Sequence, residues 1–152
     1  MQAADCKCKK QMKGKAMRQL FYFALFLSLA FGPRSCFGFW PGIKHFVRIE
    51  NELANQQLNY HCESDMDDLG YRILAPHQEW EFKFRASFDT FFQCSMWYAN
   101  FIVTFDVFYP SDAFMDRCGG VHCIWRTQES GIYLFHIKTG EWEKMYDWRT
   151  RT

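Results

Sequence analysis

The sequence lacks the motifs that identify the common classes of hydrolase, metalloenzyme and nucleotide-binding enzyme. It contains no Gly-x-Ser-x-Gly nucleophile elbow, no His-Glu-x-x-His zinc motif and no glycine-rich phosphate-binding loop. Its five histidines show no spacing that pairs one of them with a nucleophile and an orienting acid. Its carboxylates are too scattered to identify a glycosidase pair. We therefore expect no catalytic residues and no cofactor.

Basic residues are scarce in the body of the chain. The whole sequence has 18 Lys and Arg against 17 Asp and Glu. Residues 1–38 hold seven of the basic residues and one acid, so the remainder has 11 basic and 16 acidic residues and a formal charge of −5. Nucleic-acid binding needs Lys and Arg to displace counterions from phosphate. An acidic body therefore predicts that nucleic acid is not a partner.

The apolar run at residues 20–31 is too short to cross a membrane as a helix, which needs about 20 such residues. Basic residues precede this run and Gly32-Pro33 follows it, which is the layout of a secretory signal peptide. Small residues at Cys36 and Gly38 predict cleavage after Gly38. Translation starting at Met17 would give a signal peptide of ordinary length. We expect a signal peptide region at 1–38, an exported domain at 39–152 and no membrane span after processing.

The cysteine count supports export. Cys6, Cys8 and Cys36 fall in the leader, and the remaining set is even: Cys62, Cys94, Cys118 and Cys123. Four cysteines in a small secreted domain predict two disulfides. Zinc is the alternative, because His61 and His122 adjoin cysteines, but no Cys-x-x-Cys pair exists and we expect no metal.

Four cysteines allow three pairings. Cys118 and Cys123 are separated by a short loop containing two glycines, which favours a bridge between them. Cys62 and Cys94 then remain. Both fall on the inward side of expected strands, where a bridge between them would clasp a sandwich.

Period-2 alternation of apolar and polar residues recurs along the exported part, as in Trp80, Phe82 and Phe84. Other expected strands are centred on residues 47–49, 58–62, 92–96, 101–107, 121–125, 132–136 and 142–148. Turn residues separate them, including a break at residues 68–70. One short helical turn is expected at residues 111–117. This pattern predicts an all-β fold, a small disulfide-bonded antiparallel β-sandwich.

Four acids lie within six residues after the strand that ends near Cys62: Glu63, Asp65, Asp67 and Asp68. The spacing partly resembles a calcium loop, but Leu69 and Pro76 occupy positions that need oxygen ligands. Carboxylates in such a segment can accept bonds from neighbouring backbone N–H groups, and Gly70 can adopt positive φ. Unpaired charge is costly to bury, so we expect these four residues to be exposed and to contact a partner.

Taken in order, several segments resemble the plant self-incompatibility S-protein family. The most specific is His61-Cys62-x-Ser64 followed by Asp67-Asp68-Leu69-Gly70. Others are Val47-x-Ile49-x-Asn51-x-Leu53, Trp80-x-Phe82-x-Phe84, Thr90-Phe91-Phe92-Gln93-Cys94, Phe105-Asp106-Val107-Phe108, Cys118-x-x-x-x-Cys123-x-Trp125 and Gly131-Ile132-Tyr133. Met66, Gln93 and the long leader depart from the family pattern, but none alters the cysteine framework.

The resemblance implies a secreted, extracellular, non-enzymatic protein that acts through its loops on a cell-surface receptor. We expect it to be a monomer. A small secreted hydrolase or carbohydrate-binding defence protein is the alternative. That alternative needs a concave site lined by convergent titratable groups.

Overall fold

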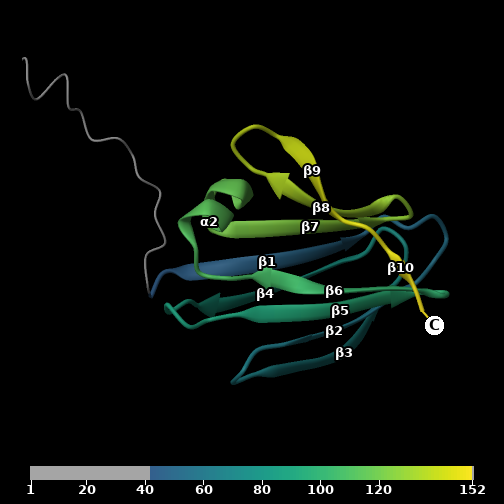
Figure 1. Ribbon diagram of the computed structural model, residues 1–152, viewed down its shortest axis with the longest axis horizontal. Coiled ribbons are helices and arrows are strands. Elements are labelled where there is room, and N and C mark those ends of the chain that lie inside the picture. Colours follow the sequence, from purple (N-terminus) through teal and green to yellow (C-terminus); the bar gives the residue numbers. More distant parts are fainter. Residues whose placement is uncertain (1–41, 152) are drawn as a thin grey trace, which may run out of the picture. The chain divides into compact units, whose positions relative to one another are not determined.

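The computed structural model describes residues 42–151, and these form two five-stranded sheets packed face to face (Figure 1). The first sheet has the order β4-β1-β7-β8-β9 and the second has the order β10-β6-β5-β2-β3. Their strands are β1 (Lys44–Asn51), β2 (Leu58–Glu63), β3 (Asp68–Leu74), β4 (Glu79–Arg85), β5 (Phe92–Tyr98), β6 (Phe101–Phe108), β7 (His122–Gln128), β8 (Gly131–His136), β9 (Glu141–Tyr146) and β10 (Arg149–Thr150). The expected all-β sandwich is confirmed.

The leader falls outside the described residues. The expected signal peptide region at 1–38, the start at Met17, the cleavage after Gly38 and the three leader cysteines therefore concern a part of the chain that the structure does not describe. Within residues 42–151, no helix is both long and apolar enough to span a membrane.

Strand pairing within the described chain is antiparallel with one exception. β1 and β7 run parallel, with Val47 opposite Cys123 and Ile49 opposite Trp125. A parallel pair needs a long crossover. Here the chain crosses to the second sheet for β2 and β3, returns to the first for β4, and forms β5 and β6 of the second sheet and then α2 before it reaches β7. The two sheets are therefore built from interleaved segments.

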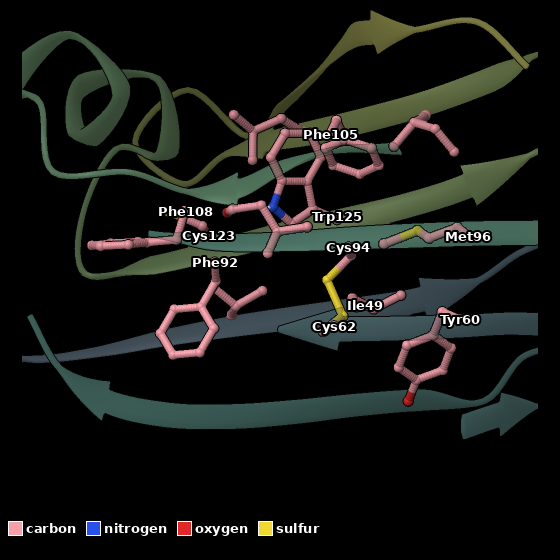
Figure 2. Close-up of a cluster of buried hydrophobic side chains, with 14 of the residues drawn as sticks. Ile49, Tyr60, Cys62, Phe92, Cys94, Met96, Phe105, Phe108, Cys123 and Trp125 are labelled. Atoms are coloured by element: carbon pink, nitrogen blue, oxygen red, sulfur yellow. Dashed lines mark hydrogen bonds between the residues drawn. A yellow bond between two sulfur atoms is a disulfide. The ribbon is translucent and has the colours of Figure 1, made fainter. Parts of the chain in front are cut away.

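Side-chain alternation explains the core. β1 buries Val47 and Ile49 and leaves Arg48 and Glu50 half-exposed on its other face. The same alternation in β5, β6 and β7 gathers large apolar side chains between the sheets (Figure 2). Trp125 is fully buried, and its indole N–H donates to the Val107 carbonyl at 3.0 Å. Full burial of an aliphatic side chain such as Ile49 contributes about 1.5–3 kcal/mol to the free energy of unfolding.

The helical turn expected at residues 111–117 is present as α2 (Asp112–Cys118). Ser111 caps it, because its hydroxyl accepts from the Phe114 N–H at 3.1 Å. Gly119 ends the helix at φ 74°. A Cβ added to Gly119 would lie 2.9 Å from the Ile137 backbone nitrogen, so both φ and close packing require glycine.

The break expected at residues 68–70 is wrong. These residues begin β3, the edge strand beside β2. The pairing register of β2 with β3 shifts between His61 and Glu63, and Gly70 has φ 76°. The start of β3 is therefore irregular, and its glycine made the sequence look like a turn.

Candidate functional site

The turn that carries the acidic residues is organised by a serine. We call residues 63–70 the acidic loop. The Ser64 hydroxyl accepts from the Asp67 N–H at 2.9 Å and from the Met66 N–H at 3.3 Å. The Ser64 N–H donates to the Asp67 carbonyl at 2.8 Å. These bonds close the turn with backbone groups and one hydroxyl, so the acidic side chains stay turned toward solvent.

Within the part of the chain that the structure describes, Asp68 is the one acid of the loop whose carboxylate forms hydrogen bonds. Its Oδ1 accepts from the Gly70 N–H at 2.8 Å and lies 2.7 Å from Nε2 of His61. The Gly70 amide, followed by the His61 ring, holds the pKa of Asp68 below its ordinary value. His61 also stacks on Tyr71, with ring centroids 4.3 Å apart. The sequence correctly indicated that Asp68 can bond a neighbouring backbone N–H.

Glu63, Asp65 and Asp67 have a different environment. All three are exposed, as is Asp68. Within the described part of the chain, no lysine or arginine forms an ion pair with Glu63, Asp65 or Asp67, and their carboxylates cap no backbone N–H. The idea that Asp65 and Asp67 carboxylates bond the turn is therefore wrong, because the Ser64 hydroxyl fills that role. Their charge is left available to a partner.

A cavity of about 310 Å³ lies beside the loop. Three of its lining residues are acidic (Glu63, Asp65 and Asp106), and the others are Ser64, Phe91 and Gln93. Gln93 donates to Asp106 Oδ1 at 3.3 Å. The Phe91 side chain is 46% exposed and gives the cavity an apolar wall.

Strand register explains how these residues meet. Glu63 on β2 lies opposite Gln93 on β5, and Gln93 lies opposite Asp106 on β6. Sequence reasoning found Glu63 and Asp65 but missed Phe91, Gln93 and Asp106. The outward parity of Gln93 and Asp106 is visible in the sequence. Their adjacency to the loop depends on which strands pair, and alternation does not reveal that.

The cavity gives little support to the hydrolase alternative. Among the described residues, those that line it include three carboxylates but no histidine. In the part of the chain that the structure covers, no group of three or more His, Cys, Asp or Glu side chains is arranged to hold a metal ion. An acidic cavity with one aromatic wall is suited to accept a basic group.

The loop is anchored by a disulfide at its base. Cys62 is bonded to Cys94, and Cys118 is bonded to Cys123, which is the pairing favoured from the sequence. Cys62 and Cys94 are direct register partners on β2 and β5. The bridge therefore joins neighbours within the second sheet, and the expectation that it clasps the two sheets is wrong.

The second disulfide joins the end of α2 to β7. With both bridges formed, the four cysteines at positions 62–123 have no free thiolate for zinc, so the zinc alternative loses the sulfur ligands on which it depended.

Comparison with known proteins identifies similar chains. Residues 46–148 match the family described as "Plant self-incompatibility protein S1". S-protein homolog 2 of Arabidopsis thaliana is 33% identical over 121 residues, which cover 76% of this chain and 75% of the relative. S-protein homolog 3 of the same plant is 36% identical over 106 residues, covering 67% of this chain and 71% of the relative.

A solved structure supports the fold. It is described as a structure of SPH (self-incompatibility protein homologue) proteins, "a widespread family of small, highly stable, secreted proteins from plants". The TM-score is 0.52 at 17% sequence identity, and the match covers 73% of this chain and 97% of the solved chain.

Proposed function

The chain belongs to the plant self-incompatibility protein S1 family, and we propose that it is a recognition protein whose acidic loop contacts a cell-surface receptor. The protein is secreted and extracellular, as the family is. The members of the family are not known as enzymes. The observation that carries the proposal is the set of exposed carboxylates of Glu63, Asp65 and Asp67, which have no basic partner among the described residues.

Electrostatics supports this role. An exposed group of like charges raises the rate of encounter with an oppositely charged surface and disfavours partners of the same sign. The effect weakens as salt shortens the Debye length, which is about 8 Å at physiological ionic strength. The acidic loop and Asp106 together present such a group beside one cavity.

The scaffold supports it as well. Binding residues are often carried on loops that a rigid framework positions. Here Glu63 directly follows Cys62, and Gln93 directly precedes Cys94. Because these two cysteines are bonded to each other, both residues of the cavity wall are attached to one disulfide. Ordering of the loop before binding reduces the entropy lost when a partner docks.

Processing is part of the proposal. We infer that residues 1–38 are a signal peptide and that the exported form starts near Phe39 and acts as a monomer. The apolar run at 20–31 and the small residues at 36 and 38 support the cleavage.

Binding to intact plant cells tests the receptor role. The labelled domain is incubated with protoplasts held in mannitol, so that salt is varied without osmotic shock. We expect saturable binding that protease treatment of the cells abolishes, and at least tenfold weaker binding by a Glu63→Lys/Asp65→Lys variant. Glu141→Lys, on β9 of the other sheet, is the matched control. Binding that survives both the protease and the charge reversal would contradict the proposal.

A further inference from the structure

The outer face of the second sheet carries three rows of side chains with different chemistry. The row nearest the acidic loop is acidic, with Glu63, Gln93 and Asp106 in register. The middle row is aromatic and polar, and it consists of Tyr71, His61, Ser95 and Thr104. The third row is largely apolar, and it consists of Ile73, Asn59, Trp97, Ile102 and Arg149.

Two large side chains on this face, Tyr71 and Ile73, are unusually exposed. Tyr71 is 77% exposed and Ile73 is 61% exposed, and both lie on β3, the edge strand. Tyr71 is held in place by its stack on His61 and by an edge contact to Trp97, with centroids 6.1 Å apart. Exposed apolar patches bordered by polar residues mark interaction sites on soluble proteins. Because ring contacts position Tyr71 although it is exposed, this patch is already shaped for a partner.

Charge defines what the partner must carry. Three carboxylates surround the cavity at the acidic end of the face, and among the described residues that line it none is basic. The apolar row has no acidic residue, and Arg149 lies at its far edge on β10. The face is therefore negative at one end and apolar at the other.

We propose that the outer face of the second sheet is one docking surface for an extended segment of a partner protein that carries a lysine or arginine and a large apolar side chain. The basic group enters the acidic cavity, and the apolar group packs on Tyr71, Ile73 and Trp97. This docking surface rests on the proposed function, and it specifies which chemical groups the partner must carry.

The register fixes the spacing of the two groups. Glu63 lies four positions after Asn59 on β2, and Trp97 lies four positions after Gln93 on β5. Strands rise about 3.3 Å per residue, so the acidic and apolar rows lie about 13 Å apart. An extended partner spans that distance with its basic and apolar residues at positions i and i+4.

A random library of 12-residue displayed peptides, selected on the folded protein with both disulfides intact, tests the proposal. We expect the selected peptides to carry Lys or Arg four residues from an aromatic or large aliphatic residue. A selected peptide should bind at least tenfold more weakly to Tyr71→Ser/Ile73→Ser and to Glu63→Lys. Because Tyr71, Ile73 and Glu63 are exposed, these variants are expected to fold. Ile137→Ser and Glu141→Lys, both outside this face, should bind like the wild type.

Four results would overturn the docking surface. Peptides that lose affinity with Glu63→Lys but not with Tyr71→Ser/Ile73→Ser would leave loop recognition standing and remove the face from it. Selected peptides without the i, i+4 spacing, or no selected peptides, would contradict the geometry. Self-association of the wild type that is lost in Tyr71→Ser/Ile73→Ser, measured by light scattering, would assign the face to a second copy of the chain.

Discussion

Nε2 of His61 lies 2.7 Å from Oδ1 of Asp68, and the same oxygen accepts from the Gly70 N–H. This pair ties the first residue of the edge strand β3 to the middle of β2. It also separates the two roles of the acidic loop. Asp68 holds the loop in place, and Glu63, Asp65 and Asp67 carry charge toward solvent.

Asp68 should make stability depend on pH in the acid range. The Gly70 amide and His61 lower its pKa from the ordinary 3.8, so its contribution is complete above that value and is lost as pH falls through the folded-state pKa. Asp68→Asn should therefore be less stable than the wild type at pH 5, and the difference should shrink toward pH 2.5. Urea unfolding across this range measures it. An equal difference at every pH would contradict the assignment.

Ser64 should matter more for stability than the acids beside it. Ser64→Ala removes the acceptor for the Asp67 and Met66 N–H groups, which by analogy with lost helix caps costs about 1 kcal/mol. Asp65→Ala, at an exposed position without such a bond, should change the free energy of unfolding by less than about 0.5 kcal/mol. Chemical denaturation of the two variants compares them, and a larger loss in Asp65→Ala would refute this description of the turn.

The two disulfides should contribute unequally. They close loops with sequence separations of 32 and 5 residues, for which chain entropy gives about 3.7 and about 2 kcal/mol respectively. Cys62→Ala/Cys94→Ala should therefore lower the free energy of unfolding more than Cys118→Ala/Cys123→Ala. Non-reducing peptide mapping of the wild type provides the control. A Cys62 peptide linked to Cys118 or Cys123 would contradict the pairing.

The exported protein should begin near residue 39. N-terminal sequencing of secreted material is expected to start within a few residues of Phe39, because Gly38 follows the apolar run with small residues at the positions a signal peptidase recognises. Peptides from residues 1–16 in the uncleaved precursor would argue against a start at Met17. A secreted form that retains residues 20–31 would contradict the processing.

The strands were predictable wherever one face is buried and the other is polar. Alternation follows directly from burial on one side of a strand. It therefore predicted β1 from Val47 and Ile49, and β4 from Trp80, Phe82 and Phe84. β3 was not predictable in this way. Its residues Tyr71, Arg72 and Ile73 are all exposed at the sheet edge, so they show no alternation between buried and exposed positions. Gly70, which adopts a positive φ in the strand, is a residue typical of turns.

The site was only half predictable for a related reason. The sequence shows four acids within six residues: Glu63, Asp65, Asp67 and Asp68. Asp106 and Phe91 join them only because β5 lies between β2 and β6, and strand order is a property of the whole sheet. The same limit applies to the parallel pairing of β1 with β7, which no local pattern marks.

The salt dependence of association tests the central claim most directly. Plasma-membrane vesicles from the source plant are immobilised, and the association rates of the wild type, Asp65→Lys and Glu141→Lys are measured from low to physiological salt and above. If the acidic loop steers the protein to a basic receptor surface, the Asp65→Lys rate should fall below the wild-type rate, most strongly at low salt, while Glu141→Lys stays close to it. Equal rates for all three proteins at every salt concentration would contradict the claim and make the acidic loop a structural turn only.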